Sequence, residues 1–167
     1  MKVSFKSLVL PAFLVLFLLG GCGSTQQQGG DENVGGEQPK DELNLELNAD
    51  SDSGRAGPLQ TVYFDFDSYA LRGDARAALD GNVSFMKENP SVEIQVEGHC
   101  DERGGIQYNL ALGENRANAV RDYLVAAGVE ARRVSTISFG KERPVAFGHS
   151  EDSWSKNRRG NFVITAK

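Results

Sequence analysis

The sequence predicts an α+β domain, a two-layer sandwich in which helices pack on one mixed four-stranded sheet. Within residues 59–167, segments with the two-residue period of a strand alternate with segments that have the period of a helix. These segments follow one another in the order β-α-β-α-β-(α)-β. This order is typical of helices that cover a sheet, because each element must bury its apolar side against another.

Each element is predicted from its own pattern of apolar residues. Strands are expected where apolar and polar residues alternate, at 62–67, 92–97, 134–139 and 161–166. Helices are expected at 73–87, 109–127 and 154–159. The first two helices have an apolar stripe, made of Ala75, Leu79, Val83 and Met86 in one and Leu110, Ala117, Val120 and Leu124 in the other. The first of them is ended by Asn89-Pro90 and the second by Gly128.

The start of the chain is predicted to be a lipoprotein signal peptide, residues 1–21. Two lysines precede an apolar run of twelve residues, from Leu8 to Leu19, which is too short to span a bilayer. The run ends in Leu19-Gly20-Gly21-Cys22, which resembles the lipobox of bacterial lipoproteins. We therefore expect Cys22 to carry the lipid anchor; the alternative is an ordinary signal peptide with an incidental cysteine. Gly23 in place of an aspartate favours the outer membrane.

Residues 22–58 are predicted to be the lipidated N-terminus followed by a disordered acidic tether. Between Gly23 and Pro58 there are eight acidic residues against two basic ones, and almost no aromatic residues. Such a segment cannot bury enough apolar surface to offset the entropy lost on ordering. The alternating stretch Leu43–Leu47 is expected to be mobile, or to dock a partner as a strand, rather than to join the core.

Charge and cysteine content exclude some classes of protein. Residues 59–167 contain fifteen acidic and fourteen basic residues, without a basic cluster large enough to bind nucleic acid. If Cys22 carries lipid, Cys100 is the one cysteine left, so no internal disulfide is expected. Cys100 is interpreted as a small packed thiol.

The end of the second strand and the helix after it contain the residues most suited to a binding site. Asp101 follows the strand, and Asn109 and Arg116 share a helix face because seven residues make about two turns. The carboxylate of Asp101 suits an ammonium group, and the guanidinium of Arg116 suits a carboxylate. Together they predict a pocket for a ligand with both charges. A structural salt bridge between Asp101 and Arg116 is the alternative.

A second candidate segment follows the first strand. Asp67 is expected to add an acidic contact there, and Phe66 and Tyr69 to form walls, since loops after strands often line ligand sites. The alternative is a plain turn that leads into the helix.

Metal, cofactor and common enzyme motifs do not fit this sequence. His99, Cys100, Asp101 and Glu102 are consecutive and therefore point in different directions, and His149 is fifty residues away. The sequence lacks the ligand spacings that are typical of zinc sites. It also lacks the motifs of nucleotide-binding loops and of serine nucleophiles. We expect neither a metal nor a cofactor.

The quoted motifs resemble those of the OmpA-like C-terminal domain family. They are Tyr63-Phe64-Asp65-Phe66-Asp67, Glu97-Gly98-His99-Cys100-Asp101-Glu102-Arg103-Gly104, Tyr108-Asn109-Leu110, Arg116-Ala117 and Asn157-Arg158-Arg159. The resemblance implies a domain over 59–167 that binds the diaminopimelate of the peptidoglycan stem peptide. It places ligand contacts at Asp101, Arg116, Asn109 and Asp67, and weaker ones at Leu112 and Arg103.

The resemblance also implies a place in the cell and a partner. It implies a non-enzymatic lipoprotein of the outer membrane of a Gram-negative bacterium, facing the periplasm and joining TolB, a periplasmic protein of the Tol system. Two rivals stay open: an enzyme that acts on peptidoglycan, and a protein-binding module whose charged pair is structural. The chain departs from the family pattern at Asn115, Gly105 and Gly160, and the first two departures bear on secondary contacts rather than on Asp101 and Arg116.

Overall fold

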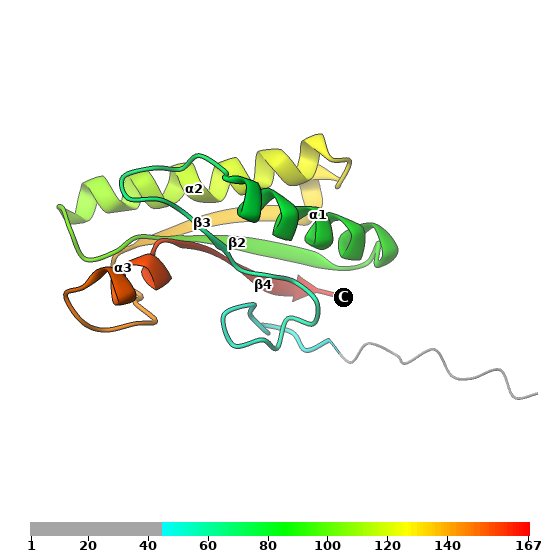
Figure 1. The fold of residues 1–167 in the computed structure, drawn as a ribbon. Helices are drawn as coiled ribbons and strands as arrows, with labels where there is room; N and C mark the ends of the chain where they lie inside the picture. Colours follow the sequence, from blue (N-terminus) through cyan, green and yellow to red (C-terminus); the bar gives the residue numbers. More distant parts are fainter. Residues whose placement is uncertain (1–44) are drawn as a thin grey trace, which may run out of the picture. The chain divides into compact units, whose positions relative to one another are not determined.

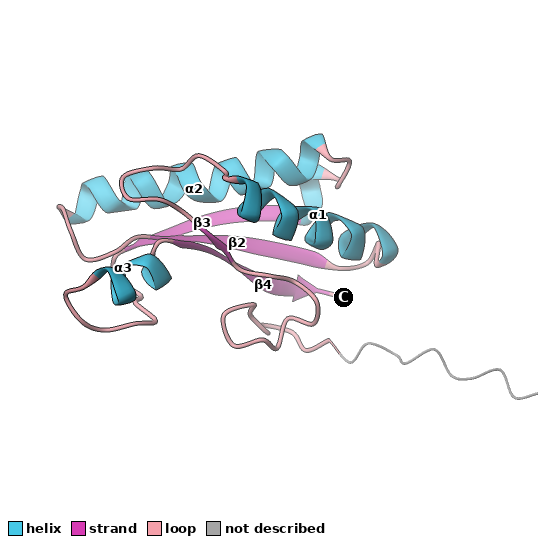
Figure 2. Cartoon of the chain, viewed as in Figure 1, coloured by secondary structure: helices cyan, strands magenta, loops and turns pink. Residues whose placement is uncertain are grey.

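The computed structural model describes residues 45–167. Along the chain lie β1 (Val62–Tyr63), α1 (Gly73–Glu88), β2 (Glu93–His99), α2 (Ile106–Ala126), the 3-10 turn η1 (Ala131–Arg133), β3 (Val134–Gly140), α3 (Glu151–Asn157) and β4 (Arg159–Ala166). The strands form one sheet in the order β1-β4-β2-β3. Because β2 runs parallel to β3 and antiparallel to β4, the sheet is mixed, and the predicted fold class is confirmed (Figures 1 and 2).

The core lies between the sheet and the two long helices. Figure 1 shows α1 and α2 side by side over one face of the sheet, with α3 at one end. The predicted stripe of α1 is buried throughout, and that of α2 is buried except for the half-buried Leu110. They pack on inward residues of the sheet such as Ile94, Val96, Phe162 and Ile164.

The first strand is shorter than the alternation of apolar residues predicts. β1 ends at Tyr63, although the Phe64 N–H still donates to the carbonyl of Arg158 at 2.9 Å. The chain then turns, and Asp67 adopts a positive φ of 54°. Phe66, which the alternation places within the strand, is consequently outside it and exposed. Asp is one of the few residues that tolerates such a backbone, so the turn at Asp67 ends the strand locally.

The expected tether is corrected by the structure over residues 45–58. Asn48 and Ser51 donate backbone hydrogen bonds to Ile164 and Phe162, and Asp50 forms an antiparallel bridge with Val163. This segment therefore lies along the edge of β4 that the two-residue β1 leaves free. An unpaired strand edge exposes backbone groups to unwanted pairing, which this cover prevents.

Side chains fasten the same segment, so its burial is specific. Leu45, Ala56 and Leu59 are buried in the core cluster, and Asp52 forms an ion pair with the buried Arg159 at 2.6 Å. The expectation that Leu43–Leu47 stays out of the core is therefore wrong for Leu45 and holds for the exposed Leu47, and the expectation that the tether reaches residue 58 is wrong over residues 45–58. Residues 1–44, with the predicted signal peptide, Cys22 and the rest of the tether, lie outside the described residues.

Candidate functional site

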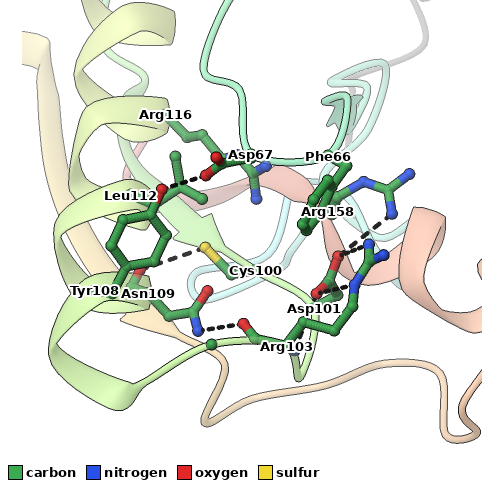
Figure 3. Close-up of a pocket in the computed structure, with 11 residues that line it drawn as sticks. Phe66, Asp67, Cys100, Asp101, Arg103, Tyr108, Asn109, Leu112, Arg116 and Arg158 are labelled. Carbon is green, nitrogen blue, oxygen red and sulfur yellow. Dashed lines mark hydrogen bonds and ion pairs between the residues drawn. The ribbon is translucent and has the colours of Figure 1, made fainter.

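A pocket of about 150 Å³ opens at one end of the sheet (Figure 3). It is lined by all six residues that the sequence proposes as ligand contacts inside the domain: Asp67, Asp101, Arg103, Asn109, Leu112 and Arg116. Phe66, Cys100, Gly104, Tyr108 and Arg158 complete the lining. Drug-sized ligands take cavities of roughly 300–1,000 Å³, so this pocket suits the end of a side chain or a small head group.

The topology of the sheet explains why distant residues meet here. β1 and β2 both run antiparallel to β4, so the C-terminal ends of β1 and β2 lie at the same end of the sheet as the N-terminal end of β4. Asp67 follows β1, Asp101 follows β2 and Arg158 precedes β4. Three segments that are far apart in sequence therefore meet at the same end of the sheet.

A close contact between β2 and α2 places the helix beside the pocket. A Cβ atom at Gly98 would lie 1.8 Å from the carbonyl oxygen of Gly113, and one at Gly113 would lie 2.8 Å from the carbonyl oxygen of Gly98. Only glycine at both positions allows the two backbones to approach so closely. This contact directs the first turns of α2, with Asn109 and Arg116, toward the end of β2.

Asp101 is paired with two arginines: Arg103 from its own loop, and Arg158, which immediately precedes β4. Arg103 donates from Nε to Oδ1 at 3.0 Å and from Nη2 to Oδ2 at 2.7 Å, and its backbone N–H donates to Oδ1 at 3.1 Å. Arg158 Nη1 lies 3.4 Å from Oδ2. Burial opposes ionisation of Asp101, but the hydrogen bonds from Arg103 outweigh it and lower its pKa. The expected alternative, a salt bridge between Asp101 and Arg116, is wrong, because Asp101 pairs elsewhere.

Arg103 links three parts of the pocket wall. Its guanidinium lies 3.9 Å from the centre of the Phe66 ring and 4.0 Å from the centre of the Trp154 ring. A planar guanidinium between two aromatic rings gains cation–π attraction on both sides. Arg103 is therefore committed to Asp101 and to the two rings, which gives it a positioning role beside the pocket.

Arg116 is a buried cation that no carboxylate neutralises in the described part of the chain. Its side chain is 0% exposed, and its nitrogens donate to the backbone carbonyls of Ser68, His99 and Asp65 at 2.8, 2.8 and 3.0 Å. Burial lowers its pKa from the ordinary value. The three carbonyls fix the guanidinium at the back of the pocket but bring no negative charge, so Arg116 favours an anionic ligand in front of it.

Asn109 and Cys100 form the side of the pocket nearest to the start of α2. Asn109 Nδ2 donates to the carbonyls of Arg103 and Gly105 at 2.8 and 3.1 Å, so the amide holds the turn in place. Within residues 45–167 nothing donates to Asn109 Oδ1, which leaves that oxygen for a ligand. Cys100 is buried, donates to the Asn109 carbonyl at 3.3 Å, and has its pKa raised to about 11 by burial. The prediction of a packed thiol is confirmed.

Asp67 is the acid of the pocket with the most open surroundings. It is exposed, and its hydrogen-bond partner in the described chain is the hydroxyl of Tyr108, which donates to Oδ1 (Figure 3). Asp67 raises the pKa of Tyr108 by accepting this bond. Phe66 lines the pocket as expected, whereas Tyr69 does not.

The charged groups of the pocket differ in whether they already have a partner. Arg103 pairs with Asp101, and Arg158 pairs with Asp101 and with Glu151, which lies outside the lining. Arg116 is therefore the lining cation without a carboxylate partner in residues 45–167. The acid with free acceptor capacity is Asp67, since both oxygens of Asp101 already accept bonds. The arrangement can bind a small group that carries a carboxylate together with an ammonium.

Two residues of the pocket were not singled out from the sequence. Arg158 supplies the second cation at Asp101, and Tyr108 supplies the hydroxyl at Asp67. Both belong to the quoted family strings, which is the one signal that pointed to them. Neither could be placed by spacing, because the contacts join the residue before β4 to the loop after β2, and α2 to the loop after β1.

The described part of the chain holds neither a metal-binding cluster nor a helix that could span a membrane. Among residues 45–167, no three His, Cys, Asp or Glu side chains are grouped so as to hold a metal ion. Within the same residues, no helix combines the length and the apolar character that crossing a bilayer requires.

Comparison with known proteins agrees with the fold. The model of the OmpA family matches residues 63–158, and the chain belongs to this family. It is also similar to proteins named peptidoglycan-associated lipoprotein. The one from Rhizobium meliloti is 37% identical over 169 residues, which cover 98% of this chain and 91% of the relative. The one from Pasteurella multocida is 50% identical over 99 residues, covering 59% of this chain and 66% of the relative, just under two thirds of its length.

A solved structure extends the similarity to three dimensions. The crystal structure of the peptidoglycan-associated lipoprotein from Burkholderia pseudomallei matches with a TM-score of 0.61 and 46% identity. The match covers 62% of this chain and 88% of that chain. The resemblance inferred from the sequence motifs is thereby confirmed.

Proposed function

We propose that this protein is a non-enzymatic outer-membrane lipoprotein that binds peptidoglycan through the diaminopimelate of its stem peptide. Lipid on Cys22 would hold the membrane end, and the pocket would hold the wall end without a covalent bond. By analogy with its family, the protein would serve the Tol-Pal system in envelope integrity and cell division, with TolB as a periplasmic partner. The similarity to proteins named peptidoglycan-associated lipoprotein supports this assignment.

The observation that carries the proposal is the buried, unneutralised charge of Arg116 at the back of a small pocket. Diaminopimelate ends in a carbon that bears both an ammonium and a carboxylate. The carboxylate would enter toward Arg116, the lining cation without a carboxylate partner in residues 45–167. Because the oxygens of Asp101 are occupied, the ammonium would be received mainly by Asp67, with Asn109 Oδ1 as a neutral acceptor.

The structure changes how this proposal must be tested. Replacing Arg116 by alanine would leave the buried carbonyl of His99 and the partly buried carbonyls of Ser68 and Asp65 without this donor. The buried one alone would cost roughly 1–3 kcal/mol, so the variant would lose stability as well as binding. Asp67 is exposed, so Asp67→Asn keeps the shape of the pocket and its fold while removing one charge.

The test is a calorimetric titration of the purified protein with a stem peptide that contains diaminopimelate, beside one that contains lysine. Lysine lacks the distal carboxylate, so its peptide should bind at least tenfold more weakly, a difference of about 1.4 kcal/mol. Asp67→Asn should weaken the diaminopimelate peptide by a similar factor and leave the melting temperature unchanged. Equal affinity for both peptides would refute the assignment of the pocket. Sustained release of muropeptides from wall fragments would instead identify an enzyme.

A further inference from the structure

A second cavity adjoins the first and has no role in the function proposed so far. It has a volume of about 260 Å³ and lies between α3 and the segment 141–149 that follows β3. Cys100 lines both cavities. Trp154 lines the second cavity and also contacts Arg103, which lines the first. Figure 1 shows the loop before α3 at the same end of the sheet as the start of α2.

The lining of this second cavity mixes aromatic surface with free hydrogen-bonding groups. Phe147 lies on it and is 83% exposed. Glu102 Oε1 accepts from His149 Nδ1 at 2.6 Å and from Trp154 Nε1 at 2.8 Å, whereas no group of residues 45–167 donates to Oε2. Lys141 Nζ donates to the carbonyls of Glu102 and Gly104, which leaves one of its three N–H groups.

The loop that carries Phe147 is fixed, although its surface is exposed. Asn157 Oδ1 accepts from the backbone N–H groups of Val145 and Ala146, and Asn157 Nδ2 donates to the Ala146 carbonyl at 2.7 Å. Ser153 donates to the carbonyl of Phe147 at 2.8 Å. Because hydrogen bonds fix the backbone of this loop, binding a ligand to the exposed Phe147 ring costs little backbone entropy. The ring is therefore preorganised for a contact.

We infer that this second cavity is a subsite for the glycan of peptidoglycan, next to the pocket for the stem peptide; the inference rests on the proposed function. A sugar ring has C–H faces that pack on aromatic rings and an edge of hydroxyl and amide groups that need hydrogen-bond partners. Phe147 and Trp154 supply the first kind of surface, and Glu102 and Lys141 supply the second.

The covalent structure of the ligand fits two adjoining cavities. In peptidoglycan the diaminopimelate is joined to the sugar through a lactyl group and two amino acids, the second of them linked through its side-chain carboxyl, which together span about 14 Å when extended. This linker is long enough to carry the sugar from the first pocket into an adjoining cavity. The second cavity adjoins that pocket, since Cys100 lines both.

The test compares two probes on the purified full-length protein in detergent: a disaccharide–tripeptide muropeptide and the same tripeptide without sugars. The muropeptide should bind at least tenfold more tightly. Phe147→Ser should remove most of this advantage and leave the affinity for the free tripeptide unchanged. The matched control is Val145→Ser, an exposed residue of the same loop that does not line the cavity, and it should change neither affinity.

Three results would overturn the inference. Equal affinities of the two probes would show that the sugars make no contact, and an unchanged muropeptide affinity in Phe147→Ser would assign the cavity to another partner. Parallel loss of both affinities in that variant would place Phe147 in the peptide pocket. Failure of the proposed function looks different, because then neither probe binds to the unaltered protein, and the inference falls with it.

Discussion

The ion pair between Arg103 and Asp101 gives the sharpest prediction about the stability of the site. Asp101 is 4% exposed and the Arg103 side chain is 30% exposed, and two side-chain hydrogen bonds of 3.0 and 2.7 Å join them. Exposed pairs contribute about 0–1 kcal/mol, and breaking a buried pair costs about 3–5 kcal/mol. This half-buried pair should therefore have a coupling energy of about 2 kcal/mol.

A double-mutant cycle with Arg103→Met and Asp101→Asn measures this coupling directly. Arg103→Met keeps an unbranched side chain between the Phe66 and Trp154 rings but removes the charge. It should lower the melting temperature by about 6–10 °C, from roughly 3–5 °C per kcal/mol for a domain of this size. Circular dichroism at several denaturant concentrations gives the free energies of unfolding.

The coupling should also depend on pH in one direction. The folded protein holds the pKa of Asp101 below its ordinary value of 3.8, so the unfolded chain binds the proton more readily. The stabilisation is therefore complete above that ordinary value and is lost as the pH falls through the lower pKa of the folded state. Additive single costs at neutral pH, within about 0.5 kcal/mol, would refute the reasoning. Arg132→Met, an exposed control, should cost less than about 0.5 kcal/mol.

Two further predictions concern the framework around the pocket. Gly98→Ala should unfold the protein or cost more than about 3 kcal/mol, because its Cβ would lie 1.8 Å from the Gly113 carbonyl oxygen. Gly81→Ala, in α1 with open space around it, should instead stabilise by about 0.5–1 kcal/mol, and thermal unfolding compares the two. Asp52→Asn should cost about 2–4 kcal/mol in denaturant unfolding, because it leaves the buried Arg159 without its carboxylate.

Two outcomes would contradict these predictions. A folded Gly98→Ala protein of unchanged stability would mean that β2 and α2 do not approach as closely as described. An Asp52→Asn protein as stable as the exposed control Asp122→Asn would mean that the segment from Leu45 onward is not fastened to the sheet.

Local patterns determined the elements of this fold, because the period of apolar residues is a property of neighbouring positions. The stripes of α1 and α2 and the alternation in β2 were read directly, and the family motifs named the residues that line the pocket. The same local reasoning placed Phe66 in a strand. It failed there because the turn at Asp67 and the contacts of β1 with β4, rather than the alternation, decide where the strand ends.

Tertiary structure alone decided which charges meet. Sequence spacing brought Asp101 and Arg116 to one pocket, but it could not show that Arg103 and Arg158 neutralise Asp101 while Arg116 donates to three carbonyls. Sequence spacing also could not show that the acidic segment after Leu45 covers the edge of β4. The composition of that segment contains no information about the free strand edge or about Arg159, which are its partners in the folded chain. Partners across the sheet depend on strand order and register, which no single segment of the chain encodes.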